Sequence, residues 1–373
     1  MAGVVVGSRH AGHGPPAEAS SRQTVSQRKT KVRYRRLAHA APLDLYAHDR
    51  AGMIGAVARK APARVYVPNS AGDSVDVIDP RTYKVVDSFP VGALPQHVTP
   101  SHDLKTLYVN DDVGNTLTPI DPITGRPGKA FRVDDPYNLY FTIDGRYAIV
   151  VAERLHRLDF RNAHTFHLVR ALTVPCAGVN HMDFSPNGRY LIASCEFSGR
   201  LLKVDVRRFR VLRVRTLPRR FSVPQDVRSS PDAKVFYVAD LAAGGVWEID
   251  PARFKVIGFI RTGSGAHGLV VGRNGKVLYV ANRNEGSVSV ISFRSRKVIH
   301  KWHIPGGGSP DMGDVSANGK VLWLSGRYNS VVYAIDTRTG GLIARIPVGA
   351  SPHGLSVWPQ PGRYSLGHTG NMR

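Results

Sequence analysis

The stretch "GVNHMDFSPNGRYLIASCEFSG", residues 178–199, reads as two short strands joined by a tight turn. The turn falls at Asn187-Gly188, because glycine adopts positive φ freely and asparagine tolerates it. A polar Asn180-His181 pair opens the first strand, and Cys195-Glu196 ends the second strand beside it. One such hairpin says little about a fold, but the pattern occurs seven times along the chain.

A recurring strand that ends in aspartate, or in a serine that replaces it, marks the repeat. These positions lie 38 to 46 residues apart: Asp79, Asp121, Asp159, Asp205, Asp250, Ser292 and Asp336. Another strand precedes each of them, as in "LYVND" (107–111) and "LYVAN" (278–282). With an apolar segment before the turn and a strand such as "KVIGFIRTG" at the end, each unit holds four short strands. Units of this length and content are typical of β-propeller blades.

The sequence therefore predicts an all-β protein, a seven-bladed β-propeller of four-stranded antiparallel blades. The first unit starts at its second strand, "RVYVPN" from Arg64, and "PHGLSVW" (352–358) supplies the missing inner strand. This pairing of the N- and C-terminal segments closes the ring and removes exposed strand edges. A helical solenoid is excluded because no segment shows a 3.6-residue apolar stripe over three turns.

The motifs "LYVND…IDP…VG…P" and "LYVAN…VSVIS" resemble the YVTN, or YncE-like, seven-bladed propeller family over residues 64 to about 358. The resemblance implies the fold and leaves the chemistry open. Similar propellers occur in nitrite reductases with d-type haem, nitrous oxide reductases with a copper cluster, lactonases and surface-layer proteins, and a fold alone does not give a function. No catalytic signature of these proteins transfers to this chain residue by residue.

Residues 1–60 differ from the repeats, because they are rich in basic residues and lack a sustained apolar period. We expect a mostly disordered N-terminal extension, followed by the propeller in 61–373 with a short tail, 359–373. The formal net charge of +23 favours nucleic acid, an anionic polymer or an acidic membrane face as a partner, unless it only keeps the surface soluble. The extension is the candidate arm for a polyanion.

No run of 18 apolar residues occurs, so no membrane-spanning helix is expected. The apolar run in "MAGVVVGSRH" is too short for the core of a signal peptide. As written, the chain is predicted to be a cytoplasmic monomer. A start codon assigned too far downstream would hide an export signal, and the protein would then be periplasmic or on the cell surface.

The residues at the start of each inner strand should converge from all blades on one face, around the central channel. Counting back from each turn gives two positions per blade, which are rich in imidazole, carboxylate and amide groups. The candidate ligand-binding residues are Gln96, His97, Tyr137, Asn138, Asn180, His181, Gln225, Asp226, His267, Asp311 and His353. Such groups form metal, haem and sugar-acid sites, although any propeller also needs polar groups at its channel mouth.

The second strands end at the same face and add a second ring of polar residues. This ring comprises Asp111, Asp112, Glu153, Glu196, Asp240, Asn282, Arg283 and Arg327, of which Glu153, Glu196, Arg283 and Arg327 are the ligand-binding candidates. Carboxylates and cations together suit a small polar or anionic ligand. The same residue types are also favoured where a turn begins.

The only two cysteines, Cys176 and Cys195, should both lie at the His-rich face of one blade. A hairpin whose paired residue numbers sum to about 375 sets Cys195 opposite Asn180. Three arrangements remain open: a disulfide, a metal site that also uses His181, and two unlinked thiols.

The leading hypothesis is a non-enzymatic binding or interaction protein with a ligand or protein partner at this face. One alternative is a lactonase-like hydrolase, in which a divalent cation polarises a ring ester. Another is a redox-associated propeller that holds haem or copper. The residues require no cofactor, a divalent metal or haem would suit them, and catalysis is left open.

Overall fold

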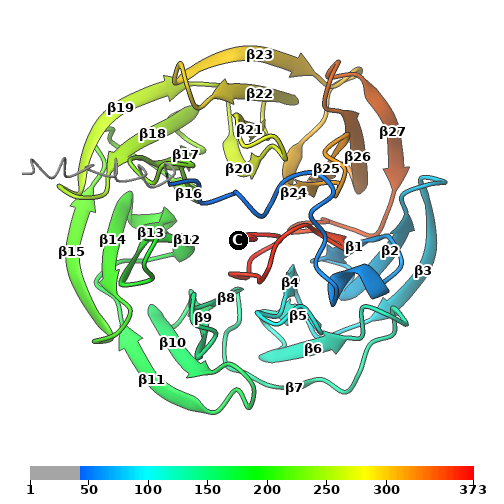
Figure 1. The fold of residues 1–373 in the computed structure, drawn as a ribbon, viewed down its shortest axis with the longest axis horizontal. Coiled ribbons are helices and arrows are strands. Elements are labelled where there is room, and N and C mark those ends of the chain that lie inside the picture. Colours follow the sequence, from blue (N-terminus) through cyan, green and yellow to red (C-terminus); the bar gives the residue numbers. More distant parts are fainter. Residues whose placement is uncertain (1–42) are drawn as a thin grey trace, which may run out of the picture. The chain divides into compact units, whose positions relative to one another are not determined.

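The computed structural model describes residues 43–373 and forms a ring of seven four-stranded antiparallel sheets around a central channel (Figure 1). The predicted fold class is confirmed. Most of the predicted N-terminal extension, with its proposed polyanion arm, lies outside the described residues. Within residues 43–373, no helix has both the length and the apolar character needed to cross a membrane.

Each blade consists of an inner, a second, a third and an outer strand. The inner strands are β28 (Ser356–Trp358), β4 (Pro95–Pro100), β8 (Asn138–Phe141), β12 (Val179–Phe184), β16 (Pro224–Ser229), β20 (Ala266–Val271) and β24 (Pro310–Val315). The second strands are β1 (Arg64–Asn69), β5 (Leu107–Asp111), β9 (Tyr147–Ala152), β13 (Tyr190–Cys195), β17 (Phe236–Asp240), β21 (Val277–Asn282) and β25 (Val321–Gly326).

The third strands are β2 (Ser74–Asp79), β6 (Thr116–Ile120), β10 (Arg157–Asn162), β14 (Arg200–Asp205), β18 (Gly245–Asp250), β22 (Ser287–Ser292) and β26 (Val331–Asp336). The outer strands are β3 (Lys84–Pro90), β7 (Phe131–Arg132), β11 (Leu168–Thr173), β15 (Arg210–Thr216), β19 (Lys255–Arg261), β23 (Lys297–His303) and β27 (Leu342–Pro347). Two short 3-10 helices, Ala58–Lys60 and Glu196–Ser198, complete the elements.

The hydrophobic core lies between neighbouring blades. Ile192 and Leu201 of one blade, for example, pack in one cluster with Val238 and Trp247 of the next. Burial falls from the channel outward: every residue of β12 is buried, whereas β15 is largely exposed. Sheets packed face to face in a ring bury the apolar side chains of both faces, which explains why the second and third strands are rich in valine.

The ring closes as predicted, because β28 pairs with β1 in the first blade. Arg64 pairs with Trp358, Val65 with Val357 and Tyr66 with Ser356. The regular strand is shorter than the predicted segment 352–358, and Pro352 adds one isolated bridge to Asn69.

The segment 359–373, which follows the closing strand, turns into the channel, and the C-terminal end lies at the centre of the ring (Figure 1). The His368 N–H donates to the Leu139 carbonyl at 2.7 Å, and the Phe141 N–H donates to the Leu366 carbonyl at 2.9 Å. Arg373 is buried and places its Nη2 2.7 Å from Oδ1 of Asp183 on β12. The segment is therefore part of the channel interior.

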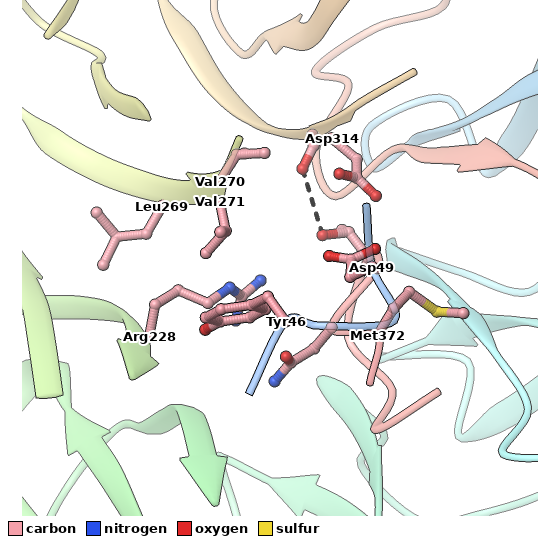
Figure 2. Close-up of a pocket in the computed structure, with 12 residues that line it drawn as sticks. Tyr46, Asp49, Arg228, Leu269, Val270, Val271, Asp314 and Met372 are labelled. Atoms are coloured by element: carbon pink, nitrogen blue, oxygen red, sulfur yellow. Dashed lines mark hydrogen bonds between the residues drawn. The ribbon is translucent and has the colours of Figure 1, made fainter. Parts of the chain in front are cut away.

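Residues 43–60 cross the face at which the inner strands end. The Leu45 N–H donates to the Pro231 carbonyl at 2.9 Å, Asp49 pairs with Arg273, and the Gly52 N–H donates to the Ala317 carbonyl at 3.3 Å. Figure 2 shows the small cavity, about 10 Å³, that this segment and residues 369–372 leave against the inner strands. This volume holds about one water molecule, so protein fills this end of the channel.

Cys176 and Cys195 form a disulfide, with 6.1 Å between their Cα atoms. The bridge rules out the metal site with His181 and the pair of unlinked thiols. The predicted register was wrong by one residue: Cys195 pairs with Val179, and the ladder then skips Asn180 and His181 before Met182 pairs with Ala193. A β-bulge, which adds one residue to one strand, causes this shift.

Replacement of Arg373 should destabilise the ring from within. Arg373→Met leaves the Asp183 carboxylate buried without its cation, so the free energy of unfolding should fall by about 3–5 kcal/mol. Urea unfolding measures this. Arg363→Met, at an exposed position of the same segment, is the control and should stay within about 0.5 kcal/mol of the wild type. Equal effects of the two variants would show that the Arg373–Asp183 pair does not hold the segment.

The disulfide should make the denatured chain unreactive toward thiol reagents unless reductant is added. Because the bridge spans 19 residues of sequence, removing it in a Cys176→Ser/Cys195→Ser variant should lower the free energy of unfolding by about 3 kcal/mol. Thiols that react fully in the denatured chain without reductant would disprove the bridge.

Candidate functional site

In five of the seven blades, the predicted residues at the start of the inner strand lie in β-bulges. The pairing of inner and second strands shifts between Val179 and Met182, and four other blades show a shift at the matching position. A bulge bends its strand and redirects side chains. In the fourth blade, formed by β12 to β15, Ser194 stabilises the bulge, because its Oγ accepts from the His181 N–H at 3.1 Å and donates to the His181 carbonyl at 3.2 Å.

Five imidazoles meet in the channel behind these bulges. His97, His181, His267 and His353 come from four inner-strand positions, as predicted, and His368 comes from the C-terminal segment. The ring centre of His97 lies 5.5 Å from that of His181, 4.8 Å from that of His353 and 5.0 Å from that of His368. All five side chains are buried. We call these five residues, together with Asp311, the channel cluster.

The channel cluster contains two groups of three side chains with the spacing of a metal site. One ligand atom from each of His97, His181 and His368 lies within 4.8 Å of the others, and His267, Asp311 and His353 form a second such group. Among the described residues, none provides a hydrogen-bond partner for either ring nitrogen of His97 or His181. Buried polar atoms in proteins almost always have partners, so these nitrogens are free to bind an ion, a ligand or water.

The imidazoles of the cluster are neutral at pH 7. Burial lowers the pKa of His97 and His181 well below the usual range, and the neighbouring His368 lowers it further. Burial also lowers the pKa of His353 and His368 well below that range. Neutral imidazole, with one ring lone pair free, is the form that binds metal ions.

Asp311 is the ionised member of the cluster. Arg283 donates to its Oδ1 through Nη2 at 2.6 Å and through Nε at 3.1 Å. Nδ1 of His267 lies 2.8 Å from the same oxygen. Burial alone would raise the pKa of Asp311, but the Arg283 charge and the adjacent imidazoles hold it well below its usual range. The cluster thus contains one buried carboxylate, Asp311, and the Arg283 guanidinium balances its negative charge.

His368 is positioned by side chains from two other blades. Asn138 Nδ2 lies 3.1 Å from its Nδ1, and the Tyr140 ring stacks on it with 5.8 Å between ring centres. Oδ2 of Asp226 lies 3.7 Å from its Nε2. Sequence reasoning placed Asn138 and Asp226 at the channel but missed His368, because residues 359–373 lie outside the repeat and carry no motif of their own.

Above the cluster, the remaining predicted residues form the channel mouth. Tyr137 covers the imidazoles, with its ring centre 5.5 Å from that of His97 and 6.0 Å from that of His181. Gln225 links two other candidates, since it accepts from Asn180 at 3.4 Å and donates to Glu196 at 2.6 Å.

Three more predicted residues complete the mouth. Arg327 donates to Ser70 Oγ at 2.9 Å and to the Ser351 carbonyl at 3.1 Å. Gln96 Oε1 lies 3.4 Å from the same Ser70 hydroxyl. Glu153 lies beside Glu196, and burial together with the Glu196 charge raises the pKa of Glu153 to about 10.

Gly354, which follows His353 at the start of its inner strand, is glycine for a steric reason. A Cβ atom on Gly354 would overlap the imidazole of His97. The absence of a side chain at the start of the inner strand of the first blade therefore makes room for the histidine of the second blade.

The Glu153 carboxyl should make stability depend on pH. Its pKa is raised in the folded state, so the folded chain keeps a proton that the unfolded chain releases, and stability should fall as pH rises from about 5 to 9. Glu153→Gln removes this titration, so the variant should gain stability over the wild type as pH increases. Urea midpoints across this range measure the effect. Glu196→Gln, which removes the repelling charge, should shift stability in the same direction, and an unchanged pH slope in Glu153→Gln would contradict the raised pKa of Glu153.

Solved structures confirm that this fold recurs in proteins of different activity. Kuenenia stuttgartiensis hydrazine synthase matches with a TM-score of 0.63 and 19% identity, over 76% of this chain and 94% of that chain. Dihydro-heme d1 dehydrogenase NirN matches with a TM-score of 0.61 and 14% identity, over 79% and 75%. A putative 6-phosphogluconolactonase from Bacteroides uniformis matches with a TM-score of 0.60 and 18% identity, over 79% and 99%. Identities this low show the fold alone.

The family assignment comes from the sequence itself. No curated protein matches this chain. A family model described as the YNCE-like beta-propeller matches residues 47–361, which include almost the whole ring. The chain therefore belongs to the YNCE-like beta-propeller family.

Proposed function

We propose that the protein is a metal-binding propeller that holds a divalent transition-metal ion in its channel on His97, His181 and His368. The observation that carries this proposal is the set of buried ring nitrogens of His97 and His181, for which the described chain offers no partner. A bound ion would satisfy a nitrogen of each ring at once.

The donor set selects the kind of ion. Imidazole nitrogens suit zinc, copper, iron and nickel, whereas calcium and magnesium prefer oxygen ligands. Three imidazoles also match sites in which the protein supplies three ligands and leaves a position for water or another molecule. Such an ion, when bound, acts as a Lewis acid on whatever occupies that position.

The rest of the site supports this use of the three histidines. Asn138 Nδ2 contacts Nδ1 of His368, and this contact holds the ring in place beside His97 and His181. Partners of this kind fix the orientation of metal-binding imidazoles. Tyr137 covers the group on the mouth side and limits contact with water.

The two alternative functions fit this geometry less well. Lactonase-like chemistry needs oxygen ligands that converge on a hard cation, but burial and the Glu196 charge raise the pKa of Glu153 to about 10, so this carboxyl at the mouth keeps its proton. A haem needs an open slot for its macrocycle, whereas the ring centres of His97, His181 and His368 are 4.9 to 5.5 Å apart. That spacing suits a single ion.

The disulfide supports an exported location. Structural disulfides persist in oxidising compartments and are rare in the cytosol, and Cys176–Cys195 is bridged. Of the two locations considered from the sequence, the bridge favours the periplasm or the cell surface.

Metal analysis tests the proposed function. The untagged chain, expressed with added zinc or copper and desalted, should retain metal, and His181→Ala should retain about one ion less per chain because a three-ligand site loses a ligand. Asn138→Ala should weaken affinity by about 10–100-fold, since it only orients His368. His300→Ala, at an exposed position on β23, is the matched control and should leave the metal content unchanged.

Thermal melting should show that each variant is folded before its metal content is compared. A folded His181→Ala variant with the metal content of the wild type would disprove the site. A wild-type chain that retains no metal under any loading condition would disprove the proposed function as a whole.

A further inference from the structure

We propose that the channel holds a second divalent transition-metal ion on His267, Asp311 and His353, which makes the centre dinuclear. This inference rests on the proposed function and extends it, because the two ions would occupy neighbouring halves of one cluster.

The second group has the spacing and the burial of a ligand set. One ligand atom of each residue lies within 4.8 Å of the others, and all three side chains are buried. Nε2 of His353 lies 3.5 Å from Oδ2 of Asp311. That distance is too long for a good hydrogen bond, but two ligands of one ion commonly stand this far apart.

Two buried polar atoms of the second group, one on Asp311 and one on His353, are available to a ligand. Arg283 and His267 engage only Oδ1 of Asp311, and within residues 43–373 nothing donates to its Oδ2 or bonds to Nδ1 of His353. A carboxylate that ligates a metal is itself usually hydrogen-bonded through its other oxygen. Arg283 fills that role here and also offsets the charge of the carboxylate.

The two groups are adjacent. The ring centre of His97 in the first group lies 4.8 Å from that of His353 in the second, and the ring centre of His181 lies 6.3 Å from that of His267. Catalytic pairs of metal ions in proteins are about 3.5–4 Å apart, so two adjacent ligand sets of this kind can each hold one ion of such a pair.

The donors of the two groups differ in hardness. Three neutral imidazoles suit copper or zinc, whereas two imidazoles and one carboxylate suit iron(II), manganese or zinc. When two kinds of metal ion are supplied together, the site that contains the Asp311 carboxylate should therefore bind the harder ion. Zinc and cobalt(II), which accept both ligand sets, are the probes for counting sites.

The rival explanation makes Asp311 a positioning residue for a single ion. In that case Asp311 would only orient His267 and His353 through their ring nitrogens, and one ion would be shared by several of the five imidazoles. The two explanations differ in stoichiometry, two ions per chain against one.

Stoichiometry therefore tests the proposal. The wild-type chain, expressed with added zinc or cobalt(II) and desalted, should contain two ions per chain by elemental analysis, and His353→Ala should contain one. His353→Ala leaves the Arg283–Asp311 pair intact, so it keeps the fold more safely than Asp311→Asn, which should also contain one ion. Asp121→Asn, at an exposed turn, is the control and should contain two.

The outcomes separate this inference from the proposed function. One ion in the wild type, unchanged in His353→Ala and lost in His181→Ala, would overturn the second site and leave the first intact. No ion in the wild type would overturn both. With copper(II), two adjacent ions should couple, so the paramagnetic signal should account for fewer spins than copper atoms, whereas a full signal would contradict a dinuclear centre.

Discussion

The pairing of β28 with β1 is the constraint on which the rest of the structure depends. Three residue pairs join the two ends of the ring, and without them the first blade would lack its inner strand and expose an edge. The same closure delivers residues 359–373 into the channel, where Arg373 reaches Asp183 and His368 joins the other imidazoles. The closure of the ring and the composition of the channel cluster therefore depend on the same C-terminal stretch of the chain.

The channel interior contains groups that are costly to bury. Unpartnered ring nitrogens and a carboxylate in a dry interior oppose folding unless partners satisfy them. Asp183 and Asp311 have such partners in Arg373 and Arg283, whereas residues 43–373 offer none to the ring nitrogens of His97 and His181. Proteins accept such violations mainly where function requires them, and the extensive core between the blades offsets their cost here.

Repeats made most of the fold predictable from the sequence. Seven copies of one pattern fix the number of blades, and counting from each turn placed His97, His181, His267 and His353 in the channel. The β-bulge was not predictable, since it depends on how the strand bends toward the channel. Because of the bulge, the cross-strand partner of Cys195 is Val179 and not the predicted Asn180. His368 was missed because its position depends on tertiary packing of a segment that no repeat describes.

The depth of the channel cluster has a consequence for kinetics. His97 and His181 are 0% exposed and His353 is 3% exposed, while residues 43–60 and 359–373 fill the channel at the opposite end. An occupant in contact with these side chains can leave only when the mouth residues or the C-terminal segment move. Its residence time is then set by the rate of local opening of the protein, so occupancy would persist long after the ligand is removed from solution.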